Sequence, residues 1–159
     1  MIDVTPLIGS HDPVGDEERL PVEDPATGER IGSVPVGDPR DVDRAVALTT
    51  EAASAWSGAS VHERAAVLHA LADVIESNLD ELARIESRDQ GKPLSLARDL
   101  EIPRAAANLR FFADAIRQDR GEFFDLGGQG LNYTLRRPHG VAGCISPWNL
   151  PLYLFTWKI

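Results

Sequence analysis

The side chain best suited to chemistry in this sequence is Asn149, which follows a short apolar run and stands between Pro147 and Pro151. An amide at the carboxyl end of a strand can point into the crevice where open α/β sheets bind ligands, and there donate a hydrogen bond to a developing oxyanion. An asparagine just before a helix whose first turn holds a proline is also a common helix cap. The residues alone favour the cap but leave both roles open.

The other candidate groups carry weaker signals. Trp148 either fills a core or borders a cofactor at the same crevice. Cys144 lies within the apolar run GVAGCIS, so we expect a small core residue rather than a nucleophile. The four histidines are scattered without ligand spacing, so no metal site is predicted. The glycines of GGQG at 127–130 lack the G-x-G-x-x-G spacing and predict a loop, not a phosphate site.

Composition limits the partners and the compartment. The chain has 159 residues, the size of one domain, and a formal net charge of -9. That charge argues against nucleic-acid and anionic-membrane partners, because both require basic patches. The sequence shows neither a leader-like amino terminus nor an apolar run of about 18 residues. With a single cysteine it cannot form an internal disulfide, so a cytoplasmic location is expected.

The elements that must position Asn149 begin with a hairpin. Residues 1–19 are rich in proline, glycine and acidic side chains, which predicts a flexible, loop-like segment. From Leu20, the stretch LPVEDPATGERIGSVPVGD alternates apolar and polar residues around a turn at 25–28, which predicts two short strands.

Three helical stretches follow. The first is predicted from Pro39 to Gly58, and the second begins after Ser60, which forms a capping-box pattern with Glu63. Within this second stretch, the helical spacing of apolar residues restarts at Asn78 and stops at Gly91. The third runs over 94–118, with a break or kink at Pro103. The expected buried stripe of the second helix consists of Val67, Leu68, Leu71, Val74 and Ile75.

Beyond Gly121 the period changes from helical to alternating. The stretch LNYTLRRP at 131–138 predicts a half-exposed strand, and GVAGCIS at 140–146 predicts a strand covered on both faces. An exposed strand, a buried strand and then a helix indicate α/β architecture.

The string GVAGCISPWNLPLYLFTWKI resembles the region of the aldehyde dehydrogenase superfamily around its catalytic asparagine. DPATGERIGSVPVGD is similar to the amino-terminal hairpin of that family, DVDRAVALTTEAASAW to its first helix, and ESRDQGKPLSLARDLEI to its next block. Within the superfamily, the segment ISPWNLPLYLFTWKI is most similar to 2-aminomuconate and 2-hydroxymuconate semialdehyde dehydrogenases.

The resemblance implies an enzyme that oxidises an aldehyde to a carboxylate with NAD or NADP. By that resemblance, Asn149 is an oxyanion-hole donor, and Ile145, Ser146, Pro147 and Trp148 line the nicotinamide-ribose part of the cofactor site. Lys158 matches a buried lysine that some members use in a proton relay; its alternative is a solvated amine on a helix surface. The resemblance favours the catalytic role of Asn149 over the cap.

The resemblance further implies an incomplete aldehyde dehydrogenase fold of class α/β. Residues 20–126 would form the hairpin and helical part of the NAD(P)-binding domain, 127–140 an oligomerisation strand segment, and 141–159 the start of the Rossmann-like core. The family's catalytic cysteine, general-base glutamate and glycine-bearing cofactor turn match nothing in these 159 residues, so we expect a fragment that is inactive alone. The complete enzyme would be a homo-oligomer. The alternative is a short non-catalytic subunit that pairs with a full-length relative.

Overall fold

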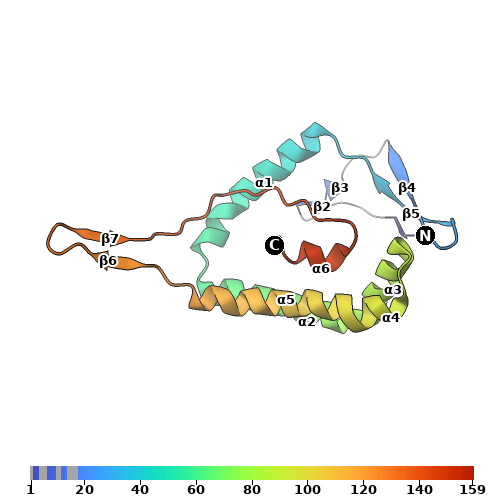
Figure 1. Cartoon of the computed structure of the whole chain (residues 1–159). Helices are drawn as coiled ribbons and strands as arrows, with labels where there is room; N and C mark the ends of the chain where they lie inside the picture. Colours follow the sequence, from blue (N-terminus) through green and yellow to red (C-terminus); the bar gives the residue numbers. More distant parts are fainter. Residues whose placement is uncertain (1, 4–6, 10–11, 14–17) are drawn as a thin grey trace.

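The computed structural model describes residues 2–3, 7–9, 12–13 and 18–159 (Figure 1). Helices make up most of this described part, with three small sheets of two or three strands. Within the same ranges, no helix is long and apolar enough to cross a membrane. The architecture is therefore mixed α/β, as the sequence predicts at the level of class.

The first sheet contains the predicted hairpin. Strands β4 (Arg19–Glu23) and β5 (Arg30–Pro35) are antiparallel, and the turn between them includes Gly28 with a φ of 73°. The Asp24 carboxylate accepts from the Ala26 amide and fixes the start of this turn. Both predicted strands are confirmed.

The amino-terminal segment contains more structure than the loop-like reading of 1–19 allows. Strand β1 (Ile2–Asp3) pairs in parallel with β5, and β2 (Leu7–Ile8) pairs with β3 (Asp12–Pro13). Long-range pairing supplies this order, which local composition does not reveal. The rest of the expectation falls on 1, 4–6, 10–11 and 14–17, which lie outside the described residues.

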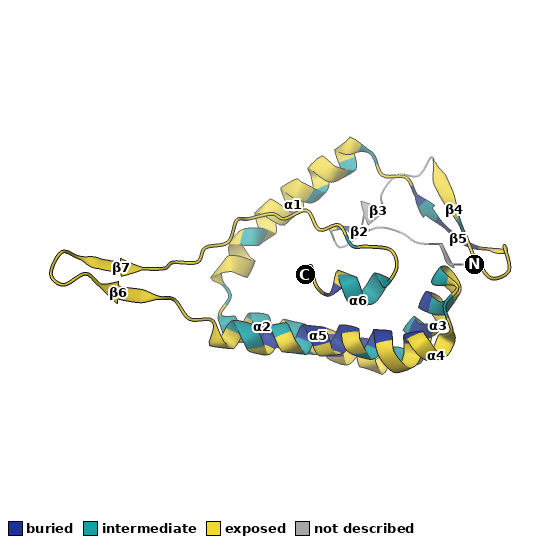
Figure 2. Ribbon diagram, viewed as in Figure 1, coloured by how far each residue is buried: buried dark blue, intermediate teal, exposed yellow. Residues whose placement is uncertain are grey.

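Helices α1 (Pro39–Gly58) and α2 (Val61–Ser77) begin with capping boxes. At α2 the Glu63 amide donates to Ser60 Oγ at 3.2 Å, and the Ser60 amide donates to Glu63 Oε2 at 2.7 Å, as predicted. Helix α1 has no buried residue in the described structure and links the first sheet to the helical pair below it (Figure 2).

The core lies between α2 and α5 (Ile102–Ala115). The expected stripe of α2 is partly wrong, because Val67, Leu71 and Val74 are exposed. Leu68 and Ile75 of the expected stripe are covered, and they share the covered face of α2 with Ala65 and Ala72. Small residues let the two helix axes approach closely, and α2 is apolar on more than one face, so periodicity alone does not select the covered one.

Helix α3 (Leu79–Gln90) ends at Gly91, whose φ of 67° is the left-handed cap that glycine favours. The helical region predicted over 94–118 is confirmed as α4 (Leu94–Leu96), η1 (Ala97–Glu101), α5 and η2 (Ile116–Gln118). The segment η1 is a π-helical turn in which the Ile102 amide donates to the Ala97 carbonyl. It ends two residues before Pro103, whose missing N–H disrupts the regular pattern of helical hydrogen bonds.

Strands β6 (Phe123–Asp125) and β7 (Leu131–Tyr133) form a hairpin that projects away from the helices (Figure 1). The loop predicted at 127–130 forms its tip, but the strand predicted over 131–138 ends at Tyr133. The buried strand predicted at 140–146 is wrong for this chain: the segment is in no strand and is almost wholly exposed. No other described strand pairs with it, so its apolar residues have nothing to cover them.

Candidate functional site

The segment before α6 (Pro151–Phe155) carries Asn149. The residue at the start of α6 is Leu150, whose carbonyl accepts from the Leu154 amide, and within the described chain no side chain caps this helix. The cap alternative for Asn149 is therefore wrong. Pro151 occupies the first turn, as expected, because its missing N–H costs nothing there.

Three contacts with α5 hold α6 in place. The Asn108 amide, which is buried, donates to the carbonyl and the hydroxyl of Thr156 at 3.0 and 3.1 Å. Arg104 donates to the Tyr153 hydroxyl at 3.0 Å, and its guanidinium lies 4.6 Å from the centre of that ring. The third contact is an edge-to-face pair of Phe112 and Trp157. The α5 residues are four apart, so one stripe of α5 fixes the segment that follows Asn149.

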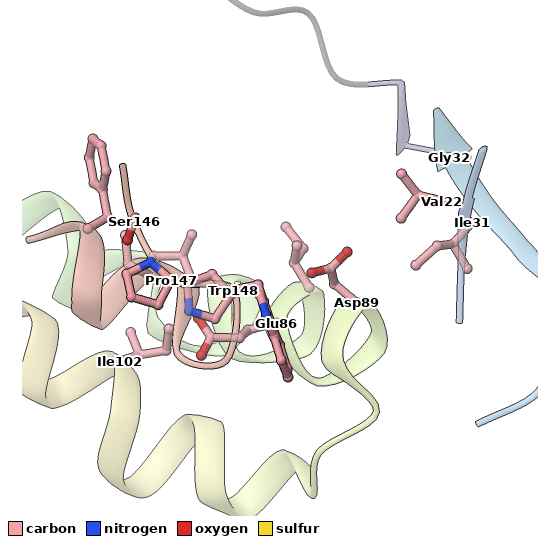
Figure 3. Close-up of a pocket in the computed structure, with 14 residues that line it drawn as sticks. Val22, Ile31, Gly32, Glu86, Asp89, Ile102, Ser146, Pro147 and Trp148 are labelled. Carbon is pink, nitrogen blue, oxygen red and sulfur yellow. The ribbon is translucent and has the colours of Figure 1, made fainter. Parts of the chain in front are cut away.

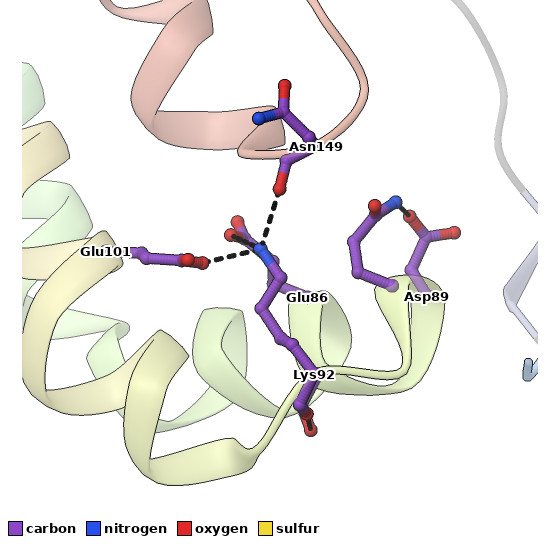
Figure 4. Close-up of polar contacts among 7 residues, drawn as sticks. Glu86, Asp89, Lys92, Glu101 and Asn149 are labelled. Atoms are coloured by element: carbon purple, nitrogen blue, oxygen red, sulfur yellow. Dashed lines mark hydrogen bonds and ion pairs between the residues drawn. The ribbon is translucent and has the colours of Figure 1, made fainter. Parts of the chain in front are cut away.

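At the other end of this segment, the Asn149 carbonyl accepts from Lys92 Nζ at 3.2 Å (Figure 4). Lys92 Nζ also donates to Glu86 Oε1 at 3.0 Å and to Glu101 Oε2 at 2.6 Å. These side chains are 10%, 5% and 6% exposed, so the cluster is buried. In Figure 4 the Asn149 side-chain amide points away from Lys92. Among the described residues it has no hydrogen-bond partner.

The cluster of Lys92, Glu86 and Glu101 contains two carboxyls and one ammonium. Burial raises the pKa of the Glu86 carboxyl above its ordinary value, the neighbouring Glu101 raises it further, and Lys92 opposes both. Burial also disfavours the Lys92 ammonium, but hydrogen bonds to Glu101 and Glu86 outweigh that effect and raise the pKa of Lys92. Lys92 therefore remains charged at neutral pH.

An open pocket of about 580 Å³ lies beside the cluster (Figure 3). On one side stand Val22, Ile31 and Gly32 of the first sheet, and on the other Ser146 and Trp148 of the segment before α6. Its remaining lining comes mainly from α3 and α6 and is mostly apolar. Among the described residues, Ser146 Oγ is the buried side-chain oxygen or nitrogen without a hydrogen-bond partner. Such an atom requires a donor or acceptor from elsewhere.

The structure brings together some of the residues that the sequence singles out. Ser146, Pro147 and Trp148 line the pocket, although the Trp148 side chain is 80% exposed. Ile145 does not line the pocket and is 90% exposed. Asn149 lies between this pocket segment and the helix α6.

Cys144, which is expected in a core, is exposed, and Lys158 takes the solvent-exposed position that was its alternative to burial. The Cys144 thiol donates to the Lys158 carbonyl at 3.3 Å, and Cys144 is open to solvent rather than in a core. Lys158 is exposed, in contrast to the buried lysine that the resemblance implies. The exposure of Cys144 follows from the lack of a strand that covers the segment 140–146 within the described chain.

Sequence reasoning missed the cluster around Lys92. Two signals were present: only two of the 16 basic residues are lysines, and Lys92 stands between a glycine and a proline, which fix its backbone. Neither signal identifies the three acceptors, which lie 6, 9 and 57 residues from Lys92 along the chain.

The Aldehyde dehydrogenase family model matches residues 13–159. The 2-aminomuconic semialdehyde dehydrogenase of Mus musculus is 50% identical over 137 residues, which make up 86% of this chain and 28% of that protein. The 2-hydroxymuconic semialdehyde dehydrogenase of Pseudomonas sp. (strain CF600) is 45% identical, over 85% of this chain and 29% of that protein. These matches confirm the resemblance to muconic semialdehyde dehydrogenases.

The crystal structure of PnpE in complex with nicotinamide adenine dinucleotide superposes with a TM-score of 0.91 at 35% identity. The match covers 99% of this chain and 32% of that one. The chain thus corresponds to the amino-terminal part of its relatives and spans less than a third of their length. By its sequence and its fold, the chain belongs to the aldehyde dehydrogenase family.

Proposed function

We propose that this chain supplies the oxyanion donor of an NAD(P)-dependent enzyme that oxidises an aldehyde, a muconic semialdehyde in particular, to a carboxylate. The observation that carries the proposal is the state of Asn149: its backbone carbonyl is bound to a buried ammonium while its side-chain amide stays free. A free amide on a fixed backbone can donate to the negative charge that develops on the aldehyde oxygen. The 50% identity to 2-aminomuconic semialdehyde dehydrogenase supports the substrate class.

The segment that holds Ser146, Pro147 and Trp148 fits a nicotinamide cofactor. Ser146 Oγ is buried without a partner beside the pocket, so a ribose hydroxyl can satisfy it. Pro147 and Trp148 offer flat apolar surface next to that hydroxyl. Such a cofactor, when bound, would supply the hydride acceptor for oxidation of the aldehyde. Ile145 is outside the pocket and would not hold the cofactor in this arrangement.

The nucleophilic cysteine and the general base belong, by family resemblance, to the two thirds of the enzyme that this chain does not span. By resemblance alone, Lys158 would be a second catalytic residue that acts in a proton relay. By the same resemblance, 20–126 would belong to the cofactor domain, 127–140 to an oligomerisation segment and 141–159 to the start of the Rossmann-like core. The exposed side chains of β6–β7 support homo-oligomer formation through that hairpin.

The test requires a complete enzyme, made by joining residues 1–159 to the carboxyl-terminal two thirds of the Mus musculus relative. In this joined enzyme, Asn149→Ala is expected to lower kcat by about 10²–10³-fold, because one oxyanion donor is lost. The KM for NAD should change little. Gln118→Ala, which removes an exposed side-chain amide in η2, is the matched control. A kcat for Asn149→Ala within twofold of the parent would refute the proposed role.

A second candidate is a non-catalytic subunit that pairs with a longer relative. The observation in its favour is the exposed apolar hairpin, where Phe123 and Tyr133 face each other across β6 and β7. Mixing the chain with the full-length relative and following sedimentation would distinguish the two. A stable mixed complex whose activity is unaffected by Asn149→Ala supports this second candidate.

A further inference from the structure

We propose that Lys92 is a positioning residue for Asn149: its buried ammonium holds the Asn149 carbonyl and so fixes the direction of the free side-chain amide. The inference rests on the proposed role of Asn149 as an oxyanion donor. Lys92 touches neither the pocket nor the asparagine amide, so it would act only through the Asn149 backbone.

The ammonium of Lys92 has three donors, and three acceptors surround it. Glu86 Oε1, Glu101 Oε2 and the Asn149 carbonyl lie at 3.0, 2.6 and 3.2 Å. No donor is left over, so the direction of each bond is set by the other two. The two carboxylates are buried on α3 and η1, which together with α2 and α5 form the helical lobe, and they cannot follow a moving loop. The Asn149 carbonyl is therefore held in place by a group that is itself rigidly fixed.

Lys92 itself is fixed at its backbone. Gly91 ends α3 in the left-handed conformation, and a Cβ there would lie 2.7 Å from the Pro25 ring, so glycine is required. Ser87 Oγ donates to the Lys92 carbonyl at 2.7 Å. Pro93 then restricts Lys92 to extended backbone angles. With its backbone fixed in this way, the Lys92 side chain runs back toward α3 and reaches Glu86.

Glu101 reaches the cluster from η1, the π-helical turn before Pro103. Such turns recur at functional sites because they redirect a side chain that a regular helix would aim elsewhere. The carbonyl of Asn149 lies before the first residue of α6, whose helical bonding begins with the Leu150 carbonyl. Lys92 thus satisfies an acceptor that the helix leaves open and that fixes the peptide plane next to the asparagine.

The experiment uses the joined enzyme in four forms: Asn149→Ala, Glu86→Gln/Lys92→Met, these three changes together, and Arg98→Met. The Glu86→Gln/Lys92→Met pair keeps the formal charge of the cluster at -1, since one acidic and one basic group are removed, and so avoids leaving two buried carboxylates unpaired. Arg98→Met breaks an exposed pair with Asp80 and is the control. Melting temperature, kcat and KM for NAD are measured for each.

We expect Glu86→Gln/Lys92→Met to lower kcat about ten- to a hundredfold with little change in KM for NAD, because a misdirected group costs up to about a hundredfold. In the Asn149→Ala background the same pair should cause no further loss, since both changes then remove one interaction. Arg98→Met should retain the parent kcat. If Lys92 had only a structural role, the Glu86→Gln/Lys92→Met pair would lower the melting temperature, and its effect on kcat would not depend on whether Asn149 is present.

Two results would overturn the inference about Lys92 and leave the proposed function of Asn149 intact. In both, Asn149→Ala lowers kcat as expected, and Glu86→Gln/Lys92→Met either leaves kcat unchanged or lowers it by the same factor with and without Asn149. If Asn149→Ala itself leaves kcat unchanged, the proposed function fails and the role of Lys92 falls with it. The Asn149→Ala form therefore separates the two failures.

Discussion

The attachment of α6 to α5 yields a quantitative prediction for the chain as it stands. Asn108 donates two hydrogen bonds to Thr156, and both residues are buried. The Thr156 hydroxyl also donates to the Tyr153 carbonyl at 2.7 Å, so the pair closes a small network. In Asn108→Ala both bonds from the amide are lost, while the aromatic contacts of α6 remain.

Each buried hydrogen bond contributes about 1 kcal/mol net, so the loss of two should lower the free energy of opening α6 by about 2 kcal/mol. That difference corresponds to about 30-fold faster amide exchange in α6. The amides to follow are those of Leu154 and Thr156, which donate to the Leu150 and Leu152 carbonyls. If α6 opens as a local unit, the amides of α2 and α5 should keep their rates.

The assay is hydrogen exchange of the 159-residue chain followed residue by residue, with Asn132→Ala as the control for the same substitution at an exposed site. Unchanged exchange of the α6 amides in Asn108→Ala would show that the network does not hold this helix. A uniform acceleration in α2, α5 and α6 would show that α6 does not open separately. Either result would refute the reasoning.

Three further predictions follow from the charge cluster, the extent of the chain and the hairpin. The pKa of Glu86 is raised in the folded chain, so the folded state binds this proton more tightly than the unfolded state, and the free energy of unfolding should fall as pH rises above the ordinary value of 4.5. Glu86→Gln should flatten that dependence in urea unfolding at several pH values, and an unchanged slope would contradict it. The 159-residue chain alone should form no NADH from semialdehydes, because the family's nucleophilic cysteine and general base match nothing in it. Turnover that Cys144→Ala abolishes would contradict our expectation that Cys144 is not a nucleophile. Phe123→Ser with Tyr133→Ser should reduce self-association in sedimentation, because both exposed rings lie on one face of the hairpin; association that the pair of changes leaves unaltered would exclude this face.

Signals that depend on neighbouring residues predicted the structure well. The hairpin turn, the Ser60 capping box and the left-handed stop at Gly91 each need only a few adjacent residues, and all three are confirmed. The helical region around Pro103 also ends where predicted, although the π-helical turn before it was not foreseen. Local backbone chemistry decides these features, so one sequence suffices for them.

Signals that depend on distant partners predicted less. The covered face of α2 is set by α5, and strand formation at 140–146 requires a neighbouring strand that the described chain does not provide. The exposure of Cys144 follows from the same cause. An apolar run indicates that a segment can be buried, but its partner decides whether it is.

At the candidate site, too, the sequence indicates Asn149 itself but not the distant contacts that position it. Family resemblance places Asn149 after a strand, where a sheet would be expected to aim it, yet here that segment lies in no strand. Its contacts instead run to the helical lobe, through Lys92 at the Asn149 carbonyl and through Asn108 at the far end of α6. Asn108 lies on α5, and Lys92 lies in the loop between α3 and α4, where Glu86 of α3 and Glu101 of η1 hold its ammonium. The lobe therefore holds the asparagine backbone independently of the sheet, which explains how its amide can be left free of internal partners.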